Sequence, residues 1–224
     1  SSAASDVYKR QSLFPSTPKE HIRQLVEWMS QGVYEKEQII AVALLCAVAG
    51  ENMFLLGPPG TAKSMVASRL KMVFKDGKSF DYLMSRFSAP DEIFGPISIS
   101  RLKNDDRYER LTAGYLPEAD VVFLDEIWKA GPSIQNTLLT VINEHIFYNG
   151  GQIMHTPMKV LIAASNELPA KDEGLEALWD RFLVRMVSNC IESDSSFFKM
   201  IKGAGADMSE LSESLYLSLI HISE

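Results

Sequence analysis

The sequence predicts a three-layer α/β fold in which helices cover both faces of a central parallel sheet. Residues 53–56, 121–124 and 160–164 are short, continuous apolar runs, a pattern typical of strands that are buried on both faces. Segments with apolar residues at helical spacing separate these runs, as residues 132–144 illustrate. This alternation favours a single parallel sheet, whose ligand-binding residues collect at the carboxyl ends of the strands.

The chain before the first strand predicts two helices. Residues 17–31 begin with the capping residue Thr17 and with Pro18 in the first turn, and their apolar side chains share one face. A second helix is expected over about residues 35–48, and Gly50 ends it.

The segment between the first and second buried strands is harder to interpret. Residues 79–85 have the composition of a strand, and residues 90–95 are typical of a turn. Residues 97–100 alternate as a short strand would, and the mixed charges of residues 101–110 indicate a solvated excursion.

After the second buried strand we expect a helix over residues 132–144, which has a proline near its start. Asn149-Gly150-Gly151 separates two strand-like pieces and predicts a β-hairpin over residues 145–157. A short helix over residues 175–180 leads to a last strand over residues 182–187.

A Gly/Pro-rich loop joins the first strand to the helix that follows it, which is the context that a phosphate-binding loop requires. Small residues let consecutive N–H groups turn toward a triphosphate, and the helix start adds its positive dipole end. Lys63 is expected on the β- and γ-phosphates, and the Ser64 hydroxyl on Mg²⁺. The expected nucleotide-binding residues of this stretch are Gly57, Pro58, Pro59, Gly60, Thr61, Ala62, Lys63, Ser64 and Met65.

Ala62 departs from the usual pattern G-x-x-x-x-G-K-[ST], in which glycine precedes the lysine. A methyl group is tolerable there if the residue has the φ and ψ of the first turn of a helix, and we expect that conformation. An ordinary Gly/Pro turn is the alternative that the loop alone leaves open.

Polar residues also follow the other two buried strands. Asp125 is expected to hold Mg²⁺ through its water shell, and Glu126 to polarise the attacking water. The amide of Asn166 could bond the γ-phosphate or the same water, and Arg181 could stabilise charge in the transition state. Taken singly, each is also compatible with a strand end, a turn residue or a surface ion pair. Their order and strand context together predict nucleotide hydrolysis.

Composition narrows the classes of protein to which the chain could belong. A chain of 224 residues with 46% hydrophobic and 23% charged residues is ordinary for a globular protein. The net charge of −7 does not favour broad contacts with nucleic acid or an anionic membrane. No apolar run reaches the ~18 residues of a membrane span. Cys46 and Cys190 lack disulfide, metal or redox spacing, which suits the cytoplasm.

Several stretches resemble AAA+ ATPases of the MoxR branch, most closely its RavA-like subgroup. They are GPPGTAKS, VVFLDEIWKA, VLIAASNELP, ALWDRF, MSRFSAPDEIFGPISI and RYERLTAGYLPEA, and the likeness covers about residues 18–187. The alanine at position 62 is shared with that branch. The resemblance implies an ATPase that uses ATP and Mg²⁺, with Walker A, Walker B and sensor 1 residues at Lys63, Ser64, Asp125, Glu126 and Asn166.

The resemblance also implies assembly into a ring, expected to be a hexamer. Arg181 would reach the nucleotide of a neighbouring subunit, and Arg185 is a second candidate for that role. Val33 and Tyr34 lie where relatives approach the adenine.

Two projections and a partner follow from the same resemblance. An insertion over about residues 97–112 and the hairpin over residues 145–157 would project from the core toward partners or substrate. MoxR-type ATPases often act with a von Willebrand factor A domain protein, so the resemblance implies such a partner and its chaperone-like remodelling.

The domain boundaries are expected as follows. Residues 12–189 form the ATPase core, and residues 190–213 form a linker toward a helical lid that is largely missing. Residues 1–11 and 214–224 resemble translated sequencing-adapter sequence, and we expect neither to belong to the fold. Because the lid closes the site in such proteins, we expect weak nucleotide binding and slow turnover.

Two other functions remain open. One is a nucleotide-gated scaffold with little turnover, which intact Glu126, Asn166 and Arg181 disfavour because a pure switch could lose them. The other is a DNA-associated AAA+ motor. The hairpin sequence HIFYNGGQIMHTP contains no lysine or arginine to contact phosphates, which disfavours that motor.

Overall fold

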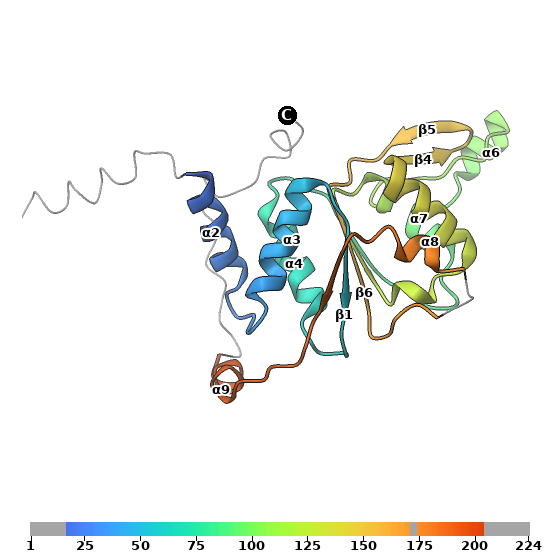
Figure 1. Cartoon of the computed structure of the whole chain (residues 1–224). Coiled ribbons are helices and arrows are strands. Elements are labelled where there is room, and N and C mark those ends of the chain that lie inside the picture. The colour runs from blue at the N-terminus through green and yellow to red at the C-terminus, as the bar shows by residue number, and fades with distance from the viewer. Residues whose placement is uncertain (1–16, 171–173, 204–224) are drawn as a thin grey trace, which may run out of the picture.

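The computed structural model of the chain describes residues 17–170 and 174–203. A parallel five-stranded sheet in the order β2-β3-β6-β1-β7 lies at its centre, with helices on both faces (Figure 1). The predicted three-layer α/β fold is confirmed. Its strands are β1 (Met53–Leu56), β2 (Ser79–Leu83), β3 (Val121–Asp125), β6 (Val160–Ser165) and β7 (Val184–Val187).

Helices α3 (Glu37–Ala49) and α4 (Lys63–Val73) cover one face of the sheet, and α2 (Pro18–Met29) packs on these two helices. The predicted cap of α2 is present, because the Thr17 Oγ1 accepts the Glu20 N–H at 3.3 Å. The Glu20 carboxylate accepts the Thr17 N–H in return, at 3.1 Å. The expected helices before β1 are therefore confirmed.

The other face is covered by α7 (Pro132–Glu144), α8 (Glu176–Trp179) and the 3-10 turn η3 (Ile127–Lys129). Its core centres on Phe54, which points away from α3 and α4 because side chains alternate along β1. The Phe54 ring centroid lies 5.2 Å from the ring centroids of Trp128 and Trp179 and 5.9 Å from that of Phe182. These aromatic contacts join the turn after β3 to the chain that carries Arg181.

Helix α6 (Ile99–Asp105) and the predicted hairpin project together from one end of the molecule (Figure 1). The hairpin consists of β4 (Ile146–Asn149) and β5 (Gln152–His155). Its Asn149 amide donates to the Arg110 carbonyl at 3.0 Å, and Asn149 Oδ1 accepts the Arg110 N–H at 2.6 Å. The two expected projections are thus joined to each other.

Two predictions between β2 and β3 are wrong. Residues 90–95, predicted as a turn, contain helix α5 (Pro90–Phe94), since Pro90 starts the helix and the Glu92 carboxylate accepts the Ala89 N–H at 2.9 Å. Residues 97–100, predicted as a short strand, supply only an isolated bridge between Ile97 and Arg110. Ser98 then caps α6 instead of continuing a strand, and the turn η2 (Leu116–Glu118) precedes β3.

Helix α9 (Asp194–Lys202) occupies part of the segment that was expected to be a linker, residues 190–213. The Glu35 carboxylate accepts the N–H groups of Glu192 and Ser193 at 2.8 and 3.0 Å, just before this helix. The hydrogen bond from Glu192 is the main reason that the pKa of Glu35 is lowered. Helix α9 is therefore tied to the turn between α2 and α3.

The described residues contain no helix that is both long and apolar enough to cross a membrane. The adapter-like segments predicted at residues 1–11 and 214–224 lie outside the described residues.

Candidate nucleotide-binding site

The register of the parallel strands brings three strand ends together. Leu56, the last residue of β1, lies opposite Ser165 of β6, and Leu124 of β3 lies opposite Ala163 of β6. Neighbouring strands are about 4.8 Å apart, and only β6 separates β1 from β3. The loop after β1, the carboxylates after β3 and Asn166 after β6 therefore lie at one edge of the sheet.

The loop after β1 is anchored to the neighbouring strands. The Gly57 N–H donates to the Ser165 carbonyl at 3.0 Å, and the Ser188 hydroxyl donates to the Thr61 carbonyl at 2.8 Å. A Cβ on Gly57 would lie only 2.3 Å from the Ser188 carbonyl oxygen, so this close approach requires glycine. The Thr61 hydroxyl closes the loop on itself by donating to the Pro58 carbonyl at 2.9 Å.

Lys63 reaches into this loop from the first turn of α4. Its side chain is buried, and Nζ donates to the carbonyl oxygens of Gly57 and Pro58 at 2.6 and 2.9 Å. Pro59 and Gly60 form the exposed tip of the loop. A cation beside the positive end of a helix suits phosphate oxygens, which would replace the two carbonyls as acceptors for Lys63.

Ala62 does not have the helical conformation predicted from the sequence. It is the N-cap of α4 and has left-handed angles, with φ 63° and ψ 21°. The chain turns here from the loop into the helix, and this reversal directs the Lys63 side chain back over the loop. A left-handed conformation costs an alanine about 1–2 kcal/mol. The anchoring hydrogen bonds of Thr61 hold this strain in place.

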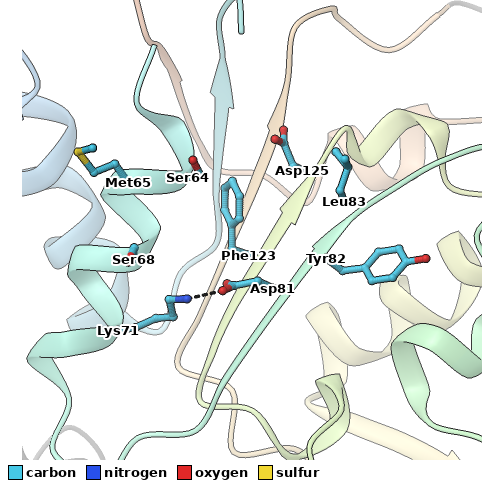
Figure 2. A pocket seen from close by; sticks show the side chains of 9 residues that line it. All are labelled: Ser64, Met65, Ser68, Lys71, Asp81, Tyr82, Leu83, Phe123 and Asp125. Carbon is cyan, nitrogen blue, oxygen red and sulfur yellow. Dashed lines mark hydrogen bonds and ion pairs between the residues drawn. The ribbon is translucent and has the colours of Figure 1, made fainter. Parts of the chain in front are cut away.

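Figure 2 shows Ser64 and Asp125 directed into one cavity, from α4 and from the end of β3 respectively. The cavity measures about 570 Å³ and is also lined by Met65. An ion pair between Lys71 and Asp81 lines its opposite end. A hydroxyl and a carboxylate are the oxygen ligands that Mg²⁺ accepts, so these two residues fit the expected ion. No group of three His, Cys, Asp or Glu side chains in the described part of the chain could hold another metal.

Glu126 follows Asp125 in a left-handed conformation, with φ 53°. Its N–H donates to the Asp125 Oδ1 at 3.0 Å and fixes the orientation of that carboxylate. The Glu126 Oε2 is buried without a hydrogen bond and forms an ion pair with the Lys129 Nζ at 3.3 Å. A buried carboxylate oxygen with spare acceptor capacity can accept a proton or a hydrogen bond from a water molecule.

The two arginine candidates differ in their surroundings. The Arg185 guanidinium stacks 4.0 Å from the Trp179 ring centroid and donates to the carbonyls of Phe182 and Trp179 at 2.9 and 3.0 Å. Arg181 is exposed, and its side chain makes no hydrogen bond or ion pair with the described residues. Of these two arginines, only Arg181 has a side chain without a partner among the described residues.

Asn166 and the two residues expected near the adenine, Val33 and Tyr34, lie in different environments. Asn166 is exposed at the end of β6, beside the start of the phosphate loop. Val33 is only 2% exposed and packs in the core under α2 and α3. The Tyr34 hydroxyl donates to the Lys199 carbonyl of α9 at 3.3 Å. Tyr34 is therefore in contact with helix α9.

Sequence reasoning missed Ser188, which anchors the loop by two hydrogen bonds. Its N–H donates to the Leu56 carbonyl at 2.7 Å, and its hydroxyl donates to Thr61. Ser188 follows β7 as Asn166 follows β6, so the rule that selected Asn166 could have selected it. The pairing of β7 with β1, which gives Ser188 its role, is a tertiary contact.

A phosphate-type loop after β1 and an acidic pair after β3, at one edge of a parallel sheet, define a P-loop nucleotide-binding protein. The chain belongs to the MoxR family of AAA+ ATPases. Residues 20–222 match the family model of the MoxR domain in the MoxR-vWA-beta-propeller ternary systems.

Individual proteins are also similar to the chain in sequence. Two uncharacterized proteins of Methanocaldococcus jannaschii, MJ0079 and MJ0812, are each 42% identical over 181 and 180 residues. These matches cover 81% and 80% of the chain but only 47% and 48% of the relatives, so the chain spans about half their length. The structural protein ORF618 of Acidianus two-tailed virus is 31% identical over 165 residues, 72% of the chain and 27% of that protein.

A solved structure shows the same fold. The crystal structure of a "putative ATPase" from Cytophaga hutchinsonii superposes with a TM-score of 0.70 at 17% identity. The match covers 97% of the chain and 64% of that protein.

The conformation of Ala62 yields a stability prediction. Ala62→Gly should raise the free energy of unfolding by about 0.5–1 kcal/mol, because relief of the left-handed strain exceeds the extra entropy that glycine loses. Ala67→Gly, in the buried middle of α4, is the matched control and should lower stability by about 1 kcal/mol or more. Urea unfolding measures both changes, and a less stable Ala62→Gly variant would contradict the left-handed conformation.

Proposed function

We propose that the protein hydrolyses ATP with Mg²⁺ at the edge of the sheet where β1, β3 and β6 end. The observation that supports this most is the convergence of Lys63, held inside its loop, with Ser64 and Asp125, which face one cavity. A buried ammonium supplies charge for the β- and γ-phosphates, and the two oxygen side chains supply ligands for the ion.

Glu126 and Asn166 each have one role in the hydrolysis of ATP. Glu126 accepts a proton from the attacking water, and Asn166 orients that water toward the γ-phosphorus. The new bond joins the water oxygen to phosphorus, while the bond to the bridging oxygen of ADP breaks. Mg²⁺, when bound, neutralises charge that develops on the phosphate oxygens. The left-handed backbone at Glu126 sets the direction of its carboxylate. Through its N–H, the same residue also orients the Asp125 carboxylate.

Arg181 completes the site from a neighbouring copy. Its guanidinium is exposed and unpaired within the described residues, whereas Arg185 is held by Trp179 and two carbonyls. An arginine supplied in trans can accelerate phosphoryl transfer by about 10³–10⁵. Hydrolysis in this account depends on assembly, and we propose a ring of six subunits in the cytoplasm.

Hydrolysis is coupled to remodelling of a protein partner. The matching family model describes ternary systems that contain a vWA component, which supports a von Willebrand factor A domain protein as that partner. The joined projections offer apolar side chains for the contact, since Tyr148 and Ile153 are each 59% exposed. The hairpin has no lysine or arginine, which disfavours nucleic acid as the substrate.

Glu126→Gln tests the role of the carboxylate. The variant should retain ATP and release phosphate at least about a hundredfold more slowly, because the amide cannot accept the proton. Phosphate release and filter binding of labelled ATP measure the two properties, and Glu37→Gln on α3 serves as the control. Rapid hydrolysis by Glu126→Gln would overturn the assignment.

A mixing experiment tests Arg181. Arg181→Ala should bind ATP normally and lose turnover, and Lys63→Ala should lose ATP binding. Mixing the two inactive variants should restore part of the turnover, because some interfaces then combine an intact Lys63 with an intact Arg181. Arg185→Ala should instead lower the free energy of unfolding, since its guanidinium packs on Trp179. A mixture that stays inactive would contradict catalysis in trans.

A further inference from the structure

Phe87 is the most exposed large apolar side chain of the described residues, at 95% exposure. It lies in the turn that follows β2, and this turn is held by side-chain hydrogen bonds. The Ser85 hydroxyl accepts the Phe87 N–H at 3.2 Å, and the Ser88 hydroxyl accepts the Ser85 N–H at 2.9 Å. The Tyr82 hydroxyl lies 3.1 Å from the Ser88 hydroxyl and fastens the turn to β2. Phe87 is therefore presented by a fixed turn, which lowers the entropy lost on binding.

A small apolar pocket lies on a different part of the molecule. It measures about 250 Å³ and is lined by Leu168, Pro169 and Ala170 from the chain after β6, with Glu176 and Trp179 from α8. A cavity of about 150 Å³ is enough for a benzene ring, so the pocket has room for a phenylalanine side chain. The exposed half of Leu168 and the Trp179 ring would provide its walls.

The charges beside the two features are opposite. Arg86, next to Phe87, is exposed. Glu167 precedes Leu168 and Asp180 follows Trp179, and both acidic residues are exposed. Glu176 itself lines the pocket, so the charge of Arg86 beside the aromatic anchor is opposite to that of the acidic residues in and next to the pocket lining.

We propose that Phe87 of one copy inserts into the pocket formed by Leu168, Pro169 and Trp179 of a second copy of this chain. The proposal rests on the proposed function, because it names the contact through which Arg181 arrives. The two surfaces consist of different residues, so the contact is heterologous and can propagate into a closed ring.

The positions of the two features explain why this contact would complete the site. Phe87 follows β2, whose Leu83 lines the cavity that Ser64 and Asp125 share. The pocket includes Trp179, two residues before Arg181. Seating Phe87 in the pocket therefore brings Arg181 of the second copy to the edge of the first copy's cavity.

Disulfide trapping between two tagged variants tests this contact directly. Burial raises the pKa of the Cys46 thiol to about 11, so this cysteine stays protonated, and only the exposed Cys190 needs replacement by serine. In that background, Phe87→Cys mixed with Leu168→Cys should form a covalent heterodimer under mild oxidation. Tyr148→Cys, on the exposed hairpin, replaces Phe87→Cys in the matched control and should not cross-link.

A charge exchange gives an independent measurement. Arg86→Glu should weaken self-association in sedimentation velocity by about tenfold, and Glu167→Lys in the same chain should restore it. No cross-link above the Tyr148→Cys control, or no restoration by the second charge, would overturn the contact. Because neither readout needs turnover, the contact can fail while the mixing experiment with Arg181→Ala still succeeds.

Discussion

The candidate site depends on the parallel pairing of β1 and β3 with β6 between them. This pairing aligns three carboxyl ends within about 10 Å, the width of two strand spacings. Lys63, Asp125 and Asn166 are far apart in the sequence, and no local interaction could bring them together. A one-residue shift of register in β6 would exchange the side chains that face the two cores, so packing on both faces of the strand fixes the site.

The loop that holds Lys63 is stabilised from outside its own sequence. Ser165 and Ser188, at the ends of the two strands that flank β1, bond the loop, and the Ser188 carbonyl leaves no room for a side chain at position 57. Left-handed residues at Ala62 and Glu126 store strain on both sides of the cavity. The sheet therefore holds a loop and a carboxylate in conformations that they would not adopt alone.

Much of this arrangement could be predicted from the sequence. The strands are continuous apolar runs, which reveal burial directly, and the polar residues that follow them show which edge binds ligand. The conformation of Ala62 could not be predicted, because the surrounding hydrogen bonds set it. The short helices α5 and α6 were missed for a related reason, since single capping contacts by Glu92 and Ser98 decide them. The role of Ser188 depends on strand pairing, and the exposure of Phe87 depends on the packing around the turn.

The most direct test of the site is a crystal structure of the protein with Mg²⁺ and a non-hydrolysable ATP analogue. The account predicts that the Lys63 Nζ leaves the carbonyls of Gly57 and Pro58 and bonds oxygens of the β- and γ-phosphates. It also predicts that the ion lies between Ser64 and Asp125, with Asn166 facing the γ-phosphate. A triphosphate bound elsewhere, with Lys63 still on the loop carbonyls, would contradict the account.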